Sequence, residues 1–201
     1  WAGVRPLVSE ESAENESSVP REHVIRVGAD GLVTIAGGKL TTYRRMGAEV
    51  VDRVVDALRG TGHQLEMLRA AETDLNPLPG AVGWPEGVDD TVVASRILEA
   101  GEGRIDARTA SLLARTYGMR GLDVVGLTKA DPTLAKAIVE GRPEICAQVV
   151  WGVERELAVT VSDIMIRRTQ LYYRDVNQGL DAIDTVANLM RPLLGWTKKK
   201  A

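Results

Sequence analysis

Residues 23–58 read HVIRVGADGLVTIAGGKLTTYRRMGAEVVDRVVDAL, and within them the apolar spacing changes from that of strands to that of a helix. Two short β-type runs, 23–27 and 32–36, flank an Asp-Gly pair, which favours a hairpin turn because glycine tolerates positive φ. After Gly37 and Gly38, apolar residues recur every three or four positions, the spacing of an amphipathic helix. The stretch predicts a hairpin, a tight glycine turn and a helix that ends near position 60.

A linker and a helical domain are predicted downstream of this stretch. Three prolines and three glycines crowd into residues 77–87, and such a cluster is typical of a linker. Beyond it, apolar residues recur at helical spacing and no strand-like alternation competes, which predicts a bundle of about four to six helices. We therefore expect an α+β chain, with a short β-hairpin and helix in 1–76, a linker at 77–87 and an all-α bundle in 88–201.

Local signals predict individual helices within the bundle. Asp106 is a candidate N-cap for a helix that stops at Gly118. Ser162 is the candidate cap of a later helix, and a last helical seam, 180–194, contains Pro192. Pro143 suits the first turn of a helix with an apolar face made of Ile145, Val149, Val153 and Leu157.

The composition excludes several classes of protein. Of the 201 residues, 44% are hydrophobic and 26% are charged, and the net charge of −3 gives no general attraction for nucleic acid. No apolar run approaches the roughly 18 residues that span a bilayer, and no signal-type leader opens the chain. The single cysteine, Cys146, excludes a disulfide framework, and two histidines leave little for a metal centre. We expect a cytoplasmic protein without a metal site.

The strongest candidate for chemistry is the segment AGGKLTTYR at 36–44. A strand that enters a helix through two glycines leaves unpaired backbone N–H groups at the helix start, and these groups favour an anion. Lys39 adds a positive charge at that place. The segment does not fit a phosphate-binding loop, because Val33 and Leu40 stand where that pattern requires glycine and a hydroxyl residue. An anion-binding or cofactor-binding edge and a plain glycine turn with a surface lysine are both open on these residues.

Arg5 is the second candidate. It lies between Val4 and Pro6, so its guanidinium is expected to emerge from a packed strand end, where it suits a phosphate or a carboxylate. An ordinary structural salt bridge is the alternative. The Ser- and Glu-rich run at 9–18 is expected to form an exposed loop.

Two motifs taken together resemble a known family. WAGVRPL at 1–7 and GGKLTTYR at 37–44 look like the C-terminal portion of the FAD-dependent, respiratory glycerol-3-phosphate dehydrogenases. The likeness covers almost the whole chain, because it continues in order through LPG at 78–80, ARTYG at 114–118, ERELA at 154–158, RRT at 167–169 and LGW at 194–196.

The resemblance implies an activity and a set of site residues. Such enzymes move hydride from C2 of sn-glycerol 3-phosphate to FAD, form dihydroxyacetone phosphate and pass the electrons to a membrane quinone. Arg5 and Lys39 match positions that hold the substrate, while no catalytic residue and no metal ligand is assigned. The residues implied to line the flavin are Gly37, Gly38, Lys39, Leu40 and Thr41.

The resemblance also implies partners. Residues 1–76 would be the C-terminal end of the FAD-dependent oxidoreductase domain, and its ADP-binding half is expected to precede Trp1. We expect the chain alone to bind FAD poorly and to turn nothing over. The helical domain is expected to serve packing, homodimer formation or peripheral contact with the inner face of the cell membrane. An α-glycerophosphate oxidase and a non-enzymatic helical interaction module are the alternatives.

Overall fold

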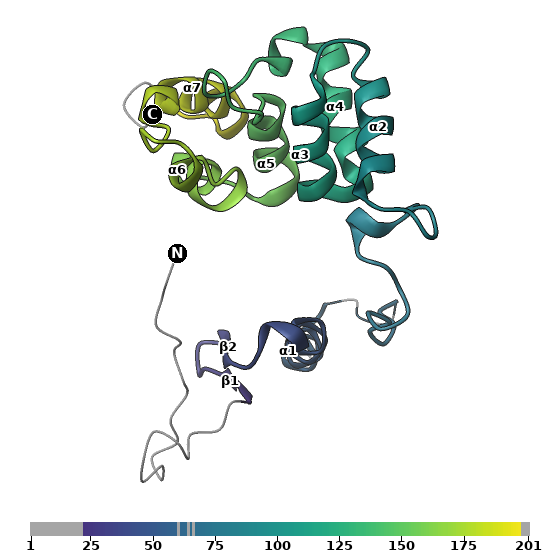
Figure 1. Cartoon of the computed structure of the whole chain (residues 1–201). Coiled ribbons are helices and arrows are strands. Elements are labelled where there is room, and N and C mark those ends of the chain that lie inside the picture. Colours follow the sequence, from purple (N-terminus) through teal and green to yellow (C-terminus); the bar gives the residue numbers. More distant parts are fainter. Residues whose placement is uncertain (1–21, 60, 64, 66, 198–201) are drawn as a thin grey trace, which may run out of the picture. The chain divides into compact units, whose positions relative to one another are not determined.

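The computed structural model describes residues 22–59, 61–63, 65 and 67–197, which form two compact units (Figure 1). The first unit ends at Pro77 and the second begins at Leu78. The predicted fold class is confirmed, since a β-hairpin and a helix precede a helical bundle. The predicted boundaries at 76 and 87 stay a prediction. Arg5 lies outside the described residues.

A two-stranded antiparallel sheet opens the first unit. Strand β1 (His23–Val27) pairs with β2 (Val33–Gly37) in a register that sets His23 opposite Gly37 and Val27 opposite Val33. The second strand starts one residue later than the sequence predicts. Leu32 belongs to the turn, because its N–H donates to Asp30 Oδ1 at 3.1 Å while its carbonyl accepts from Gly28 N at 2.8 Å.

The helix of the first unit comes after a short 3-10 helix. Helix α1 (Tyr43–Leu58) directly succeeds the 3-10 helix Leu40–Thr42, and it packs on β2. Its half-buried apolar residues Met46, Val50, Val54, Val55 and Leu58 have the predicted helical spacing. None of the described residues of 22–77 is fully buried, so the described part of this unit encloses no core.

The second unit is a bundle of helices with a continuous apolar core. In Figure 1, α2, α3 and α4 lie side by side, and α5 packs between α4 and α7. The core runs from Val93 in α2 to Met190 in α7. The α-helices are α2 (Asp90–Ala100), α3 (Ala107–Tyr117), α4 (Gly121–Ala130), α5 (Ala147–Glu156), α6 (Leu171–Arg174) and α7 (Ile183–Leu194).

Aspartates begin three helical segments of this unit. Asp106 caps α3 as the sequence predicts, since its carboxylate accepts the N–H of Thr109 at 2.8 Å. Asp89 caps α2 and Asp131 caps the 3-10 helix Pro132–Ala135 in the same way. The other end of α3 is fixed by Gly118, whose φ is +61°.

Two predicted helix starts differ from the structure. Helix α5 begins at Ala147 and Pro143 precedes it, because Ile145 pairs with Ala137 in an isolated β-bridge. Leu157, predicted on the apolar face, is a left-handed residue after the helix and is 85% exposed. Ser162 makes no side-chain cap bond.

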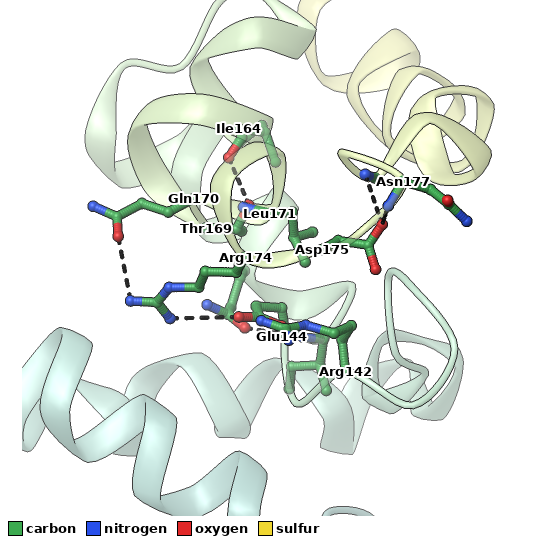
Figure 2. Close-up of polar contacts among 12 residues, drawn as sticks. Arg142, Glu144, Ile164, Thr169, Gln170, Leu171, Arg174, Asp175 and Asn177 are labelled. Atoms are coloured by element: carbon green, nitrogen blue, oxygen red, sulfur yellow. Dashed lines mark hydrogen bonds and ion pairs between the residues drawn. The ribbon is translucent and has the colours of Figure 1, made fainter. Parts of the chain in front are cut away.

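The segment Asp163–Arg168 is a π-helix. Its closing residue is Thr169, whose N–H and hydroxyl donate to the carbonyl of Ile164 at 2.9 and 2.7 Å (Figure 2). Each turn of such a helix spans one more residue than an α-helical turn. Thr169 is buried, so its hydroxyl satisfies this bond inside the bundle.

Candidate functional site

The predicted site lies where β2 leads into α1. Gly37 and Gly38 have φ of +81° and +79°, which L side chains rarely adopt, and Lys39 then returns to an extended conformation. The chain next forms the 3-10 turn Leu40–Thr42, which closes with the Thr42 N–H and hydroxyl both donating to Lys39 O. The predicted order of strand, glycine turn and helix is therefore confirmed.

Gly38 is covered by its own helix. A Cβ at this position would lie 2.6 Å from Met46 Sδ and 3.2 Å from His23 Cβ. Met46 of α1 therefore packs closely against Gly38. On that side of Gly38, the packing of Met46 and His23 leaves no space for a ligand.

The backbone N–H groups of the turn are suited to binding an anion. Within the described residues, the N–H groups of Leu40 and Thr41 donate to no backbone carbonyl. Lys39 is exposed beside them, and Leu40 is 87% exposed. Two unpaired donors next to an ammonium group can hold a negatively charged group, or a ring edge that gains negative charge. The turn therefore fits one wall of such a site.

Arg44 fixes the helix start that carries these groups. Its Nε donates to Thr73 Oγ1 at 2.9 Å and its Nη2 donates to the carbonyl of Asn76 at 2.6 Å. The guanidinium thus ties α1 to the segment before Leu78. Arg44 is engaged in these bonds, which leaves Lys39 as the exposed cation of the turn.

A second polar cluster joins β1 to α1. Glu49 accepts from Arg45 Nε at 2.7 Å and lies 2.6 Å from His23 Nε2. The hydrogen bond from Arg45, and then that from His23, hold the pKa of Glu49 below its usual value. Its neighbours Asp52, Arg53 and Asp56 help to line a cavity of about 340 Å³ beside His23. Its three carboxylates make this cavity unsuited to a phosphate.

The structure brings five of the six predicted site residues together. Gly37, Gly38, Lys39, Leu40 and Thr41 are consecutive and share one turn. Arg5 falls outside the described residues, so its convergence with Lys39 stays a prediction. The role of all six in binding likewise stays a prediction.

The second unit holds a cavity that the sequence did not reveal. It measures about 580 Å³ and has Trp84, Tyr117 and Trp151 in its wall. Arg120 lies over the Trp151 ring at 4.9 Å from its centroid, and Tyr117 meets the same ring edge to face. Burial raises the pKa of Tyr117 to about 12, so its hydroxyl stays protonated. Residues of the motifs at 78–80 and 114–118 lie together in its wall, and their pairing is the one sequence feature that could have indicated it.

Two kinds of site are absent from the described part of the chain. No three His, Cys, Asp or Glu side chains gather there in a way that would hold a metal ion. None of the helices it contains has the length and apolar character needed to cross a membrane.

Comparison with known proteins identifies relatives along the chain. A family described as the C-terminal domain of alpha-glycerophosphate oxidase matches residues 71–201. The chain is 33% identical over its whole length to a probable mitochondrial glycerol-3-phosphate dehydrogenase of Dictyostelium discoideum, and 32% identical over 98% of its length to the mitochondrial enzyme of Rattus norvegicus. It spans only 30% and 26% of those two proteins.

A solved structure supports the fold. The glycerol-3-phosphate dehydrogenase of Bacillus halodurans, determined in complex with FAD, matches 88% of this chain with a TM-score of 0.56 and 24% identity. The match covers 34% of that protein. At this level of identity the likeness shows the shared fold.

Proposed function

Because the chain belongs to the family of the C-terminal domain of alpha-glycerophosphate oxidase, we propose that it is the C-terminal part of an FAD-dependent sn-glycerol-3-phosphate dehydrogenase. The observation that carries the proposal is the alignment of nearly the whole chain with glycerol-3-phosphate dehydrogenases at 30–33% identity. The whole protein would oxidise C2 of glycerol 3-phosphate and form dihydroxyacetone phosphate, with a quinone as acceptor. It would work in the cytoplasm at the inner face of the cell membrane.

The turn at Gly37–Thr41 would form one wall of the flavin site. FAD, when bound, accepts the hydride and gains negative charge on its ring. The unpaired N–H groups of Leu40 and Thr41 would stabilise that charge, because fixed donors need no rearrangement as it develops. The positive φ of Gly37 and Gly38 supports this role, since it turns the chain sharply enough to present the two groups at one edge.

Lys39 would hold an oxygen of the substrate. Its ammonium is exposed at the same turn and would attract the phosphate or the hydroxyl oxygens of glycerol 3-phosphate. Arg5 would supply a second cation from the segment before β1. Both residues would bind and orient the substrate, and the group that removes the C2 hydroxyl proton would come from the remainder of the enzyme.

The experiment that tests the proposal uses the full-length enzyme. The full-length enzyme should reduce a dye when glycerol 3-phosphate is supplied. Lys39→Ala and Arg5→Ala should each lower kcat/KM by an amount equivalent to about 2–4 kcal/mol of lost transition-state stabilisation. Lys136→Ala, an exposed lysine of the second unit, should leave the kinetics unchanged. Absence of glycerol-3-phosphate oxidation would overturn the proposed activity, and unchanged kinetics in both site variants would remove those residues from the site.

The isolated 201-residue chain provides a second test. It should bind FAD poorly and show no turnover, because the turn supplies only one wall. Isothermal titration of FAD into the chain measures this directly. Micromolar binding would show that the chain holds a complete site.

An oxidase is the second candidate, because the matching family is described from alpha-glycerophosphate oxidase. The two activities share the substrate and differ in the electron acceptor. Oxygen consumption with formation of hydrogen peroxide by the full-length enzyme would favour the oxidase. Reduction of a quinone analogue without oxygen uptake would favour the dehydrogenase. A helical interaction module with no enzymatic role is the interpretation that remains if neither is found.

A further inference from the structure

We propose that the second unit binds a phosphate monoester in a groove between α3 and α6. This arginine groove has a volume of about 570 Å³ and is lined by Arg108, Ser111, Arg115, Thr116, Pro143 and Arg174, among others. It belongs wholly to the second unit, so it is separate from the turn at Lys39. The proposal does not rest on the proposed function.

One face of α3 supplies two of the guanidinium groups. Arg108, Ser111 and Arg115 have a spacing of three and four residues, so their side chains project from the same side of the helix. Arg108 and Arg115 are seven residues apart, which is about 10.5 Å along the helix axis. The Ser111 hydroxyl lies on the turn between them. An anion in the groove could therefore contact the Arg108 guanidinium, the Ser111 hydroxyl and the Arg115 guanidinium, which follow one another along the helix.

The third guanidinium comes from α6 and is held in place by two neighbours. Arg174 Nη1 lies 3.5 Å from Glu144 Oε1, and its Nη2 donates to Gln170 Oε1 at 3.3 Å (Figure 2). Both bonds are long, and the side chain keeps 43% of its surface exposed. Arg174 is therefore oriented by these contacts and still accessible to a ligand.

The carboxylates near the groove do not neutralise it. The Glu144 side chain is only 1% exposed and is shared, since its other oxygen lies 3.5 Å from Arg142 Nε. Arg115 pairs with Asp90 at 2.6 Å through Nε, and Arg108 makes no ion pair with any residue that the structure describes. Asp106 lies near Arg108, whose charge helps to lower the pKa of that carboxyl, but the residues that line the groove include three arginines and no carboxylate. The lining of the groove is therefore positively charged.

Two other arginines of the second unit each pair with one carboxylate. Arg167 lies 2.9 Å from Asp163, and Arg168 lies 3.3 Å from Glu156. Each of those arginines has a dedicated carboxylate, which explains its place in the fold without a ligand. Arg108, like the exposed Arg96 and Arg155, makes no ion pair with a described residue, so what points to a ligand is its place beside Arg115 and Arg174 in one groove.

A phosphate monoester matches this set of donors better than a carboxylate does. It presents three terminal oxygens and a charge of about −1.5 to −2 near neutral pH. Guanidinium groups bind such oxygens in pairs, and the hydroxyls of Ser111 and Thr116 add further donors. A carboxylate, with two oxygens and one charge, would leave a guanidinium without a partner. A free phosphate ester and a phospholipid with a monoester headgroup share this chemistry.

Binding of inorganic phosphate to the full chain tests the proposal. Two-dimensional NMR should show saturable shifts of the Ser111 and Thr116 amides, with a Kd of about 1 mM or lower. The double variant Arg108→Gln/Arg115→Gln should weaken binding at least about tenfold, because two charge-assisted contacts are lost. Arg96→Gln, an exposed arginine of α2, should leave the Kd unchanged.

Vesicles separate the two sources of the ligand. Phosphatidylcholine vesicles with phosphatidic acid carry the monoester, and vesicles with phosphatidylglycerol supply negative charge without it. Sedimentation with the first kind only, lost in the double variant, assigns the groove to a lipid headgroup. Binding of inorganic phosphate alone assigns it to a free phosphate ester.

Two results would overturn the proposal. One is the absence of binding in both the phosphate and the vesicle experiments. The other is binding that survives in a double variant whose circular dichroism spectrum shows a folded bundle. Lys39→Gln should leave groove binding unchanged, so failure of the proposed substrate site and failure of the groove are distinguished.

Discussion

The two units of the chain differ in how they keep their shape. Every buried apolar residue that the structure describes lies in the second unit, between Val93 and Met190. In the first unit, hydrogen bonds and a tight turn set the backbone, while the apolar face of α1 stays half-buried. Burial of apolar surface, worth about 25 cal/mol per Å², is the main source of folding free energy. The candidate flavin turn thus belongs to a segment that needs a covering surface, which the rest of the proposed enzyme would supply.

Separating the two units should give the largest effect. Residues 78–201 alone should melt in one cooperative transition, because they contain the whole described core. Residues 22–77 alone should show no cooperative transition, because one hairpin and one helix bury too little surface. Circular dichroism melts of both fragments measure this. A sharp melt of 22–77 would remove the contrast between the units.

Matched cavity variants should sharpen the same contrast. Leu113→Ala should lower the free energy of unfolding of the second unit by about 2–5 kcal/mol, because its side chain is fully buried. Val54→Ala on α1 should change the free energy of the chain's cooperative transition by less than about 1 kcal/mol, because that side chain is only half-buried and lies outside the described core. Denaturant titrations of the full chain, followed by the fluorescence of Trp151, measure both changes. Equal effects would show that α1 is packed as tightly as α3.

Replacing a glycine with alanine should destabilise the second unit at one position and stabilise the helix of the first unit at another. Gly118 has a φ of +61°, and a Cβ there would collide with the carbonyl of Gly80. Gly118→Ala should therefore cost about 1–3 kcal/mol in thermal unfolding. Gly47 lies inside α1 with open space around it, so Gly47→Ala should favour the helix by up to about 1 kcal/mol. A stabilising Gly118→Ala would show that the backbone contact with Gly80 is dispensable.

Removing a helix cap should give the smallest change in stability, and that change should depend on pH. Asp106→Ala should cost about 0.5–2 kcal/mol at neutral pH, because the carboxylate accepts the N–H of Thr109. That bond lowers the pKa of Asp106, so the stabilisation is complete above the ordinary value of about 3.9 and is lost as pH falls through the depressed folded value. Thr42→Ala at the start of α1 should change the stability less, since the Thr42 hydroxyl makes no cap bond and its hydrogen bond to Lys39 O is exposed.

Denaturant midpoints from pH 7 down to pH 3 check this prediction. Asp106→Asn serves as the control, because its amide oxygen caps the helix without titrating. The difference between the parent chain and Asp106→Ala should shrink toward acid pH. A difference that stays constant with pH would contradict the assigned role of the carboxylate.

The local sequence signals predicted which elements form better than they predicted the residues at which those elements begin and end. Asp30 and Gly31 identified the hairpin, and Asp106 identified the start of α3, because each acts on neighbours within a few residues. The predicted helix start at Pro143 was wrong, since the β-bridge of Ile145 with Ala137 and a bond from Ile145 N–H to Gln148 Oε1 hold that segment outside the helix. Such contacts depend on tertiary packing, which spacing along the chain does not encode.

The two candidate sites also differ in how well the sequence predicted them. The turn at Gly37–Thr41 was predictable because its residues are consecutive. The arginine groove was not identified from the sequence, although Arg108, Ser111 and Arg115 carry a visible helical stripe. Its third cation, Arg174, lies far along the chain and joins the stripe only through the folding of α6 beside Glu144. Positions distant in sequence need the fold before they can be grouped.

The π-helix Asp163–Arg168 comes directly before α6 in the bundle. Its wider turn accommodates a surplus residue, so a deletion within it would let the segment relax to α-helical geometry without breaking the coil. The bond from the Thr169 N–H to the carbonyl of Ile164 would then span four residues in place of five, as in an α-helix. The residues after the deletion would keep their direction, so the wide turn lets the chain vary in length by one residue while Arg174 stays beside α3.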